Sequence, residues 1–211
     1  MDQSYQQKNW WLIRHAPVLT DKIYGQMDVS ADFSNSARIE EIAKNLPDGA
    51  TYYSSDLQRC VQTAARLLSG HSEPQSSIEQ FTQLREQSFG AWEGLSYSEI
   101  EKNDAKAYES FWQDPVGNTP GDGESFMTMS KRVTILLEKW ITEDAERNVV
   151  VSAHAGPIRV MIGYALGLTP QKMLALSVAP LSVTRLISFT RDADTIWRIE
   201  CINDQGSLRK Q

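Results

Sequence analysis

The chain has 211 residues, which is enough for one domain with a sizeable core and short for two. Hydrophobic residues make up 41% and charged residues 23%, as in an ordinary globular protein. The net charge of −6 and the lack of any Lys/Arg run argue against a nucleic-acid-binding surface or a basic membrane anchor.

In the first half of the chain, apolar runs alternate with helical stripes. The run WWLIRH at 10–15 stops at charged residues, as a buried parallel strand does, and ATYYSS at 50–55 predicts a second strand. Ser55 or Asp56 is available as the N-cap of the helix that follows. Apolar residues at helical spacing predict two helices, one with Ile39, Ile42, Ala43 and Leu46, the other with Leu57, Cys60, Val61, Ala64 and Leu68.

The second half holds the longest expected helix and the clearest expected strand. Residues 70–94 show no sustained period and are expected to form connections, followed by a weakly helical region to about Trp112. The longest amphipathic helix is predicted at 126–140, and NVVVSAH at 148–154 predicts a buried strand. Pro157 suits the first turn of the next helix. Two later apolar runs predict further strands, at 183–189 and 196–202.

This alternation predicts an α/β fold, a three-layer sandwich with a mostly parallel central sheet and helices on both faces. We find no internal repeat or linker, and expect a single domain over 1–211 with polar tails at 1–9 and 203–211. No stretch approaches the roughly 20 apolar residues that span a bilayer, and the polar N-terminus lacks a signal-peptide core. Cys60 and Cys201 are expected as separate buried thiols in a reducing compartment, so we predict a cytoplasmic protein.

Polar groups follow three of the predicted strands. Arg14 and His15 end the first strand, Arg59 lies in the first turn of the helix after the second, and His154 ends the third. Ligands of such folds gather at the carboxyl ends of the strands, so these groups are expected to converge. His71, in a polar connection, is not part of this pattern.

Two histidines and two arginines at one sheet edge suit phosphoryl transfer. A neutral imidazole is a nucleophile near pH 7 if its other ring nitrogen has an acceptor, often a backbone carbonyl. Guanidinium groups bind phosphate oxygens and stay charged, and a protonated second histidine can donate to the same oxygens. A carboxylate is then needed to protonate the leaving alcohol. Taken singly, each of these residues also fits a solvated arginine or a structural histidine.

Five motifs in register resemble the histidine phosphatases, or phosphoglycerate-mutase-like superfamily. They are RHA at 14–16, SSDLQRCVQTA at 54–64, LREQSFGAWEG at 84–94, GDGES at 121–125 and VVVSAHAGPIR at 149–159. The resemblance covers about residues 10 to 168 and implies a phosphoglycerate-mutase-like fold. It implies a phosphomonoesterase that acts on a small-molecule phosphate ester through a phosphohistidine intermediate, with no metal and no cofactor.

The resemblance also implies the roles of individual residues. His15 is the nucleophile, Arg14 and Arg59 hold the phosphoryl group, and His154 donates to it. Glu86 protonates the leaving group and later acts as base for the hydrolytic water. Without the motif, Glu86 reads as an exposed loop carboxylate, indistinguishable from the other glutamates nearby, which are Glu93, Glu99 and Glu124.

The sequence departs from the family pattern after the nucleophile. Ala16-Pro17-Val18 stands where the family usually has Gly-Glu-Thr, and no asparagine lies between His15 and Asn35, where the family has one that contacts phosphate. An alanine is tolerated there unless the backbone needs a positive φ. Thr20, Tyr24 and Gln26 have side chains that can replace the missing contacts. Gly25-Gln26 resembles the family's usual Gly-Gln pair near the phosphate mouth, and Ser54 is a further candidate contact that suits a helix cap equally well.

Within the family, the chain resembles the α-ribazole phosphatases and related sugar phosphatases. α-Ribazole 5′-phosphate and a sugar phosphate are therefore candidate substrates. Mutase-type transfer is the first alternative, but the interval 95–123 contains only Lys102 and Lys106 to hold a second phosphate. Aromatic side chains either line a substrate pocket or pack a cap against the core; they are Phe89, Trp92, Tyr97, Tyr108, Phe111 and Trp112.

Other classes of function remain as alternatives. A catalytically silent binding domain on the same fold is the main one, although a silent copy would be free to lose His15. A metallohydrolase that uses His15 and His154 is disfavoured, because the neighbouring arginines repel a cation. A nucleotide-binding module is weaker still, since no Gly-rich phosphate loop follows the first strand.

Overall fold

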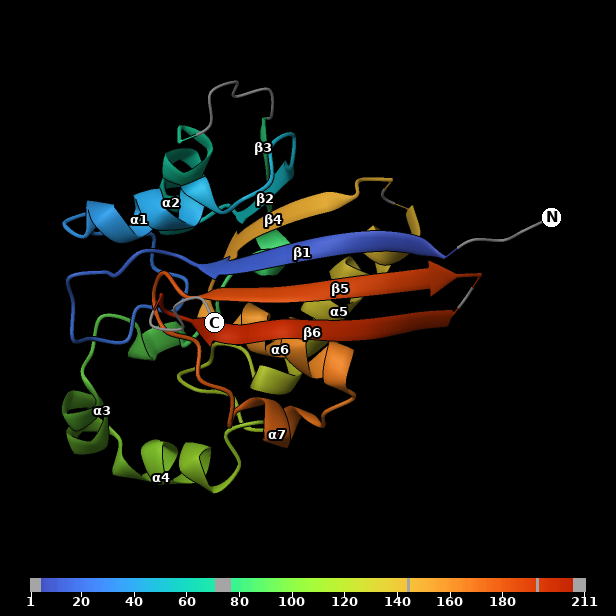
Figure 1. The fold of residues 1–211 in the computed structure, drawn as a ribbon. Helices are drawn as coiled ribbons and strands as arrows, with labels where there is room; N and C mark the ends of the chain where they lie inside the picture. Colours follow the sequence, from blue (N-terminus) through green and yellow to red (C-terminus); the bar gives the residue numbers. More distant parts are fainter. Residues whose placement is uncertain (1–4, 71–76, 144, 193, 207–211) are drawn as a thin grey trace.

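The computed structural model describes residues 5–70, 77–143, 145–192 and 194–206. Its centre is a six-stranded sheet in the order β3-β2-β4-β1-β5-β6 (Figure 1). Four strands run parallel, and β5 is antiparallel to both of its neighbours, β1 and β6. The strands are β1 Gln6–Arg14, β2 Thr51–Ser55, β3 Ile78–Phe81, β4 Asn148–Ala153, β5 Val183–Arg191 and β6 Asp194–Asp204.

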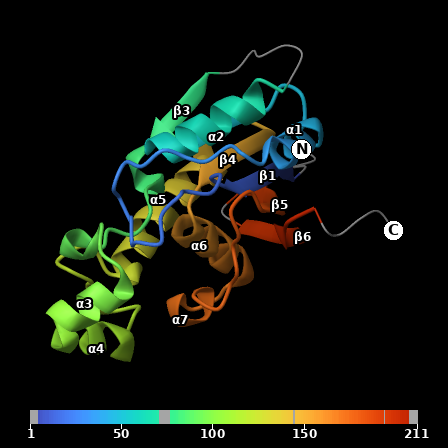
Figure 2. The same ribbon diagram turned by 90° about the vertical axis from the view of Figure 1, so that its left-hand side faces the viewer.

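Helices cover both faces of this sheet (Figure 2). On one face lie α1 Ser36–Lys44 and α2 Gln58–Leu68, and on the other α5 Phe126–Glu143, α6 Ala155–Leu166 and the short α7 Pro170–Met173. Side chains alternate along β1, so Trp10 and Leu12 join the core under α5 and α6, whereas Trp11 and Ile13 pack with α1. The prediction of a three-layer α/β sandwich with a mostly parallel sheet is confirmed.

A small helical lobe lies beside the sandwich. It contains α3 Tyr97–Asn103, α4 Ala105–Gln113 and the 3-10 turn η2 Gly90–Trp92 (Figure 1). Its core is formed by Ile23, Trp92, Ile100 and Phe111, with Phe89 and Tyr108 against them. Of the six aromatic residues weighed from the sequence, four thus pack the lobe, while Tyr97 and Trp112 remain 48% and 49% exposed.

The structure differs from the expected elements in several places. Residues 70–94, expected to form connections, include β3, the 3-10 turn η1 Thr82–Leu84 and η2, because a four-residue edge strand carries too short a pattern to recognise. β1 begins at Gln6, so residues 6–9 belong to a strand and not to a polar tail. Their backbone pairs with β5 from Gln6 onward and with β4 from Asn9 onward, and this pairing tolerates polar side chains. β6 likewise continues to Asp204. His71 and the outermost parts of both expected tails lie outside the described residues.

The prediction that Ser55 or Asp56 caps the helix after β2 is wrong. The N-cap residue of α2 is Leu57, whose side chain makes no capping bond. The Gln58 N–H instead donates to the Asp28 carboxylate at 2.7 Å, and the Asp56 carboxylate pairs with Arg85. A carboxylate from a distant loop thus meets the helix N-terminus, while Ser55 Oγ accepts the N–H of the N-cap residue Leu57 at 3.3 Å.

An aromatic stack joins α5 to the sheet. The Trp140 ring stacks on Tyr53 of β2 with centroids 4.7 Å apart and meets Phe81 edge-on at 5.0 Å and Trp10 at 6.4 Å. Trp140 is 4% exposed. This stack therefore binds the longest helix to three strands of the sheet.

We expect Trp140→Ala to lower the free energy of unfolding by about 3–5 kcal/mol, since it removes a buried aromatic side chain and leaves a cavity. Ile135→Ala, on the same helix at a position 67% exposed, should change it by less than about 0.5 kcal/mol. Urea unfolding followed by circular dichroism measures both. Similar effects of the two substitutions would contradict the role assigned to the stack.

Candidate active site

Three parallel strands end side by side at one edge of the sheet. Arg14 of β1 pairs with Ala153 of β4, and Ser54 of β2 pairs with Ser152 of β4. The next residues of β1 and β4, His15 and His154, therefore leave the sheet at the same level, and Ser55, the last residue of β2, lies one position before them. The His15 N–H also donates to the Ala153 carbonyl at 2.9 Å, and the two imidazole rings meet edge-on with centroids 5.1 Å apart.

His15 has the state that a nucleophile requires. Its Nδ1 lies 2.7 Å from the Ala16 carbonyl, an acceptor only, so Nδ1 carries the proton and the Nε2 lone pair is unprotonated. The side chain is 1% exposed. Burial and the nearby charges of Arg14 and Arg59 lower the pKa of His15 to about 3, which keeps the imidazole neutral at pH 7.

Arg14 has an unused donor beside this imidazole. Its Nη1 donates to the Val178 carbonyl at 2.7 Å, whereas its buried Nε–H has no acceptor among the described residues. A buried N–H without a partner is costly, and an oxyanion placed there would satisfy it. Arg14 therefore fits the predicted phosphate-binding role.

Arg59 lies at the centre of the cluster and is fully buried. Its Nη1 and Nη2 donate to the carbonyls of Met27 and Gly25 at 2.7 and 2.6 Å, which holds the loop after β1 over the site. Its Nε donates to His154 Nδ1 at 3.2 Å, and the Tyr24 ring lies 5.0 Å from the guanidinium carbon.

The tautomer of His154 follows from its neighbours. Arginine Nε–H can only donate, so His154 Nδ1 accepts from Arg59 and the ring proton resides on Nε2. Nε2 lies 3.0 Å from Ser55 Oγ and 3.3 Å from Cys60 Sγ. Burial, followed by the nearby His15 and arginines, lowers the pKa of His154 well below its usual value. From the sequence, Ser55 is predicted only as a helix cap. No motif or spacing in the sequence indicates its contact with His154.

Glu86 reaches the same cluster from the loop after η1. Its Oε1 accepts the Gly156 N–H at 3.1 Å, in the first turn of α6. A helix N-terminus favours a negative charge, so the position suits a carboxylate. A Cβ at Gly156 would lie 2.2 Å from Oε1, so only glycine permits this approach.

The residues predicted to replace missing family contacts separate into two groups. Tyr24 and Gly25 lie in the cluster, since the Tyr24 ring meets His15 edge-on and Gly25 O accepts from Arg59. Gln26 donates to the main-chain carbonyl of Glu86 at 3.1 Å. Thr20 is exposed, with Oγ1 accepting from the Lys22 N–H, and Ser54 is buried, with Oγ donating to the Ser55 carbonyl. Neither of these two is brought into the cluster.

The alanine that replaces the family glycine is accommodated. Ala16 is fully buried and is not one of the residues with a positive φ, so its methyl group causes no backbone strain. Its N–H donates to Thr63 Oγ1 at 3.0 Å, which ties the residue after the nucleophile to α2.

A pocket of about 230 Å³ adjoins the cluster and shares Tyr24, Gly25, Glu86 and Gly156 with it. Arg159, whose Nε donates to the Leu176 carbonyl at 2.8 Å, is a pocket residue to which the sequence analysis gave no role. The remaining lining is mixed polar and apolar and consists of Asp21, Lys22, Ile23, Gln87, Phe89, Tyr97, Phe126 and Leu174.

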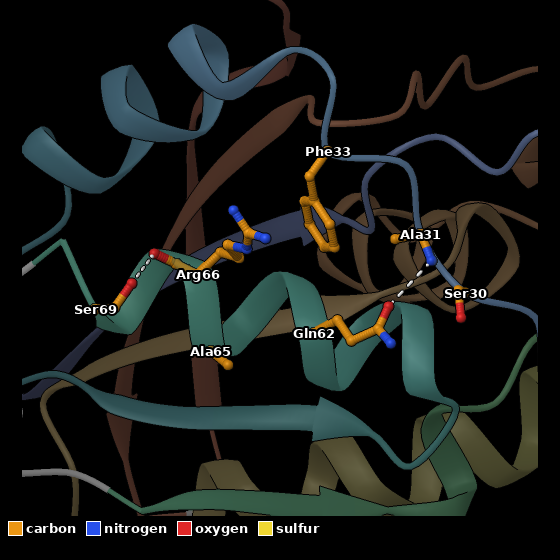
Figure 3. A pocket seen from close by; sticks show the side chains of 7 residues that line it. All are labelled: Ser30, Ala31, Phe33, Gln62, Ala65, Arg66 and Ser69. Atoms are coloured by element: carbon orange, nitrogen blue, oxygen red, sulfur yellow. Dashed lines mark hydrogen bonds between the residues drawn. The ribbon is translucent and has the colours of Figure 1, made fainter.

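A second hollow, of about 500 Å³, lies between the segment 30–33 and α2 (Figure 3). The Arg66 guanidinium carbon lies 4.6 Å from the centroid of the Phe33 ring, and Gln62 accepts the Ala31 N–H at its other end. None of the predicted catalytic residues lines this hollow, so the pocket next to Glu86 is the candidate active site.

Two further findings concern metals and membranes. Within the described ranges, no three His, Cys, Asp or Glu side chains gather as a metal-ion site would require. None of the helices in the part of the chain that the structure describes has the length and apolar character needed to cross a membrane.

Comparison with known proteins agrees with this geometry. The adenosylcobalamin/alpha-ribazole phosphatase of Escherichia coli K12 is 28% identical over 169 residues, which cover 77% of this chain and 81% of that protein. The glucosyl-3-phosphoglycerate phosphatase of Mycolicibacterium vanbaalenii is 29% identical over 208 residues, 89% of each chain. The solved structure of the alpha-ribazole phosphatase from Shigella flexneri shares the fold, with a TM-score of 0.77 over 96% of this chain and 100% of that chain, at 21% identity.

Residues 10–205 match the model of the histidine phosphatase superfamily (branch 1). This match contains His15, Arg14, Arg59, Glu86 and His154. The protein therefore belongs to the histidine phosphatase superfamily and is a phosphatase.

Proposed function

We propose that this protein is a small-molecule phosphomonoesterase that works through a phosphohistidine on His15. The observation that carries the proposal is a neutral imidazole with an unprotonated Nε2 beside a buried arginine N–H without an acceptor. The lone pair is a nucleophile, and the unsatisfied donor of Arg14 is suited to a phosphoryl oxygen.

In the first proposed step, His15 Nε2 attacks phosphorus and the bond from phosphorus to the ester oxygen breaks. Arg14 and Arg59 stabilise the charge on the three phosphoryl oxygens. Glu86, protonated at that moment, gives its proton to the departing oxygen, which leaves as a neutral alcohol. The product of this step is phosphohistidine and the Glu86 carboxylate.

In the second step, the Glu86 carboxylate takes a proton from water while the water oxygen attacks phosphorus. The N–P bond breaks, neutral His15 is regenerated and inorganic phosphate leaves. His154 is proposed to donate to the phosphoryl group during both steps. Since its Nε2 proton faces Ser55 Oγ and its Nδ1 accepts from Arg59, this donation requires an exchange of partners when the anion arrives.

The substrate's organic part is proposed to occupy the pocket beside Glu86, which aromatic and apolar side chains line in part. α-Ribazole 5′-phosphate and a sugar phosphate remain the candidates, and similarity to an alpha-ribazole phosphatase and a glucosyl-3-phosphoglycerate phosphatase supports both. We propose hydrolysis rather than mutase-type transfer: Lys102 and Lys106, the two lysines weighed for a second phosphate, are exposed and outside the pocket, whose cationic residues are Lys22 and Arg159.

We also propose a cytoplasmic enzyme with no nucleic-acid partner. Both cysteines are free: Cys60 is buried against His154, and Cys201 is half-buried within β6. Free thiols in a small domain agree with a reducing compartment.

The depressed pKa of His15 predicts an imidazole that stays neutral far below pH 6.5. Because the folded pKa of about 3 lies below the unfolded value, protonation should begin only near pH 4. Histidine ¹⁵N chemical shifts recorded from pH 8 to pH 4 measure it, and the urea-unfolded chain, in which all histidines should titrate near 6.5, is the control. A His15 that titrates near 6.5 in the folded protein contradicts the proposed resting state.

We expect His15→Ala to lose turnover by about 10³-fold or more, since it removes the nucleophile. The measurement is phosphate release without added metal from a panel of α-ribazole phosphate, sugar phosphates and 3-phosphoglycerate. Circular dichroism confirms that the variant is folded. A near-normal rate in the folded variant on any substrate overturns the mechanism, and activity of neither protein on the panel favours a silent binding domain.

The substitution Glu86→Gln should lower kcat/KM to a degree that depends on the leaving group of the substrate. On p-nitrophenyl phosphate we expect kcat/KM within about threefold of wild type, because p-nitrophenolate departs without a proton, whereas an alkyl phosphate should lose about 10²-fold. Steady-state kinetics on both substrates make the comparison. His15→Ala is the control that loses both, and an equal loss in Glu86→Gln would remove Glu86 from the acid role.

A further inference from the structure

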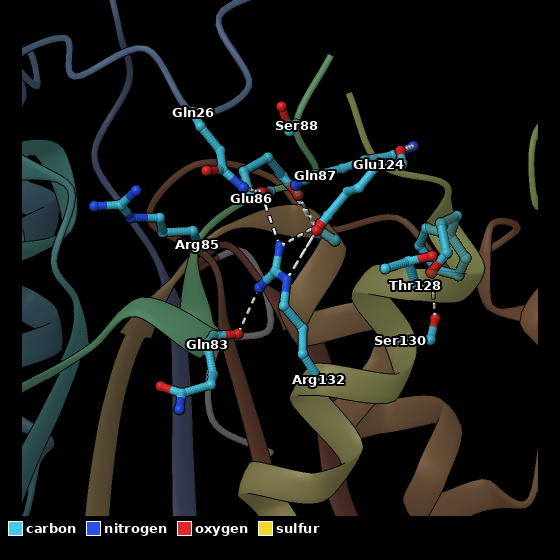
Figure 4. Close-up of polar contacts among 12 residues, drawn as sticks. Gln26, Gln83, Arg85, Glu86, Gln87, Ser88, Glu124, Thr128, Ser130 and Arg132 are labelled. Atoms are coloured by element: carbon cyan, nitrogen blue, oxygen red, sulfur yellow. Dashed lines mark hydrogen bonds and ion pairs between the residues drawn. The ribbon is translucent and has the colours of Figure 1, made fainter. Parts of the chain in front are cut away.

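The loop that carries Glu86 has an anchor that the proposed chemistry does not use. Arg132, on α5, donates from Nη2 to the main-chain carbonyl of Glu86 at 3.0 Å (Figure 4). Its Nη1 donates to the carbonyl of Gln83 at 2.5 Å. One guanidinium therefore bridges the two ends of the segment 83–86 and restricts where the backbone of the acid can lie.

Glu124 holds Arg132 in place. Its carboxylate accepts from Arg132 Nε at 2.9 Å and from Nη2 at 2.9 Å, a bidentate pair with the side chains 14% and 22% exposed. Such a planar pair restricts the orientation of the guanidinium as well as its position. Glu124 belongs to the GDGES motif, so the pair links this motif to the acid loop.

Two further hydrogen bonds, one from a main-chain N–H and one from a side-chain amide, join the two segments. The Glu124 N–H donates to the Ser88 carbonyl at 2.9 Å, and Gln87 Nε2 donates to the Glu124 carbonyl at 2.8 Å. A Cβ at Gly123 would lie 2.1 Å from the Ser88 carbonyl oxygen, so only glycine allows the segments to come this close. The acid loop thus rests on the start of α5.

Glu86 is consequently held at both ends. Its main-chain carbonyl accepts from Arg132 and from Gln26, while its carboxylate accepts from Gly156 N–H. With the backbone released, the carboxylate could follow α6 alone and change its distance from the leaving oxygen. A displacement of about 1 Å in a catalytic group can cost about 10²-fold in rate.

We propose that Arg132 is a positioning residue for Glu86, fixing the backbone from which the acid reaches the leaving group, with Glu124 as its counter-charge. This rests on the proposed role of Glu86 as general acid. The Glu124 carboxylate compensates the charge of Arg132, whereas none of the hydrogen-bond acceptors of Arg59 is an anion, and Arg132 does not line the pocket. It therefore acts through Glu86 rather than as a phosphate ligand.

The test is the dependence of kcat/KM on the leaving group. Arg132→Gln is assayed on aryl and alkyl phosphates of increasing alcohol pKa, together with Glu86→Gln. We expect kcat/KM to fall by about tenfold or more on alkyl phosphates and by less than about threefold on p-nitrophenyl phosphate. The reason is that a misplaced acid slows only reactions whose leaving group must be protonated. Arg132→Lys, which keeps one charged donor, should recover part of the loss.

Lys131→Gln is the matched control, since Lys131 is the exposed neighbour of Arg132 on the same helix, and it should behave as wild type. Thermal unfolding confirms that each variant is folded at the assay temperature. If Arg132→Gln does not fold, Glu124→Gln replaces it: this variant keeps acceptors for Arg132 but weakens the pair, and should show the same dependence to a smaller degree.

A leaving-group dependence shared by Arg132→Gln and Glu86→Gln supports the proposal. The positioning role is overturned if Glu86→Gln shows a steep leaving-group dependence while Arg132→Gln loses activity equally on all substrates or loses none. The acid role of Glu86 is intact in that case. No leaving-group dependence in Glu86→Gln itself overturns the acid role, and the positioning role with it.

Discussion

The buried guanidinium of Arg59 is the interaction on which the rest of the site depends. A fully buried charge is costly unless hydrogen bonds compensate it, and here three bonds go to His154, Gly25 and Met27, none of which is an anion. These hydrogen bonds supply no counter-charge, although the nearby carboxylates of Glu86 and Asp28 favour the charged state of Arg59. The unsatisfied Nε–H of Arg14 is part of the same site. The neutral state of His15 follows first from its burial and then from the nearby charges of Arg14 and Arg59, the two arginines proposed to bind the phosphoryl anion.

The same contacts also fix the loops of the site relative to one another. Arg59 binds the loop 16–28 through two carbonyls, and that loop in turn reaches the acid segment through Gln26. Cys60 lies against His154, but burial raises the pKa of its thiol, so the sulfur stays protonated and does not compete as a nucleophile. The immediate neighbours of the two histidines thus agree with the proposal that His15 Nε2 is the nucleophile.

The proposed acid, Glu86, is placed by different elements from the proposed nucleophile, His15. His15 and His154 extend directly from paired strands, whereas Glu86 lies on a loop that depends on α5, through Arg132, and on the N-terminus of α6, through Gly156. Two close approaches that only glycine permits, at Gly123 and Gly156, bring these elements together. This explains why a chain that lacks the family's polar residues after the nucleophile still assembles the acid: none of the contacts to Glu86 comes from Ala16, Pro17 or Val18.

The sequence alone determined the sandwich, most of its elements and the convergence of His15, Arg14, Arg59 and His154, because buried strands and amphipathic helices leave local patterns and parallel strands end at a common edge. The role of Glu86 required the family motif, since nothing local separates one loop glutamate from another. Only the tertiary structure showed that Ser55 meets His154 instead of capping α2, that Asp28 meets that helix, and that Arg132 holds the backbone of Glu86. These are contacts between segments about 30 to 100 residues apart, and their partners are chosen by three-dimensional packing, which no local periodicity records.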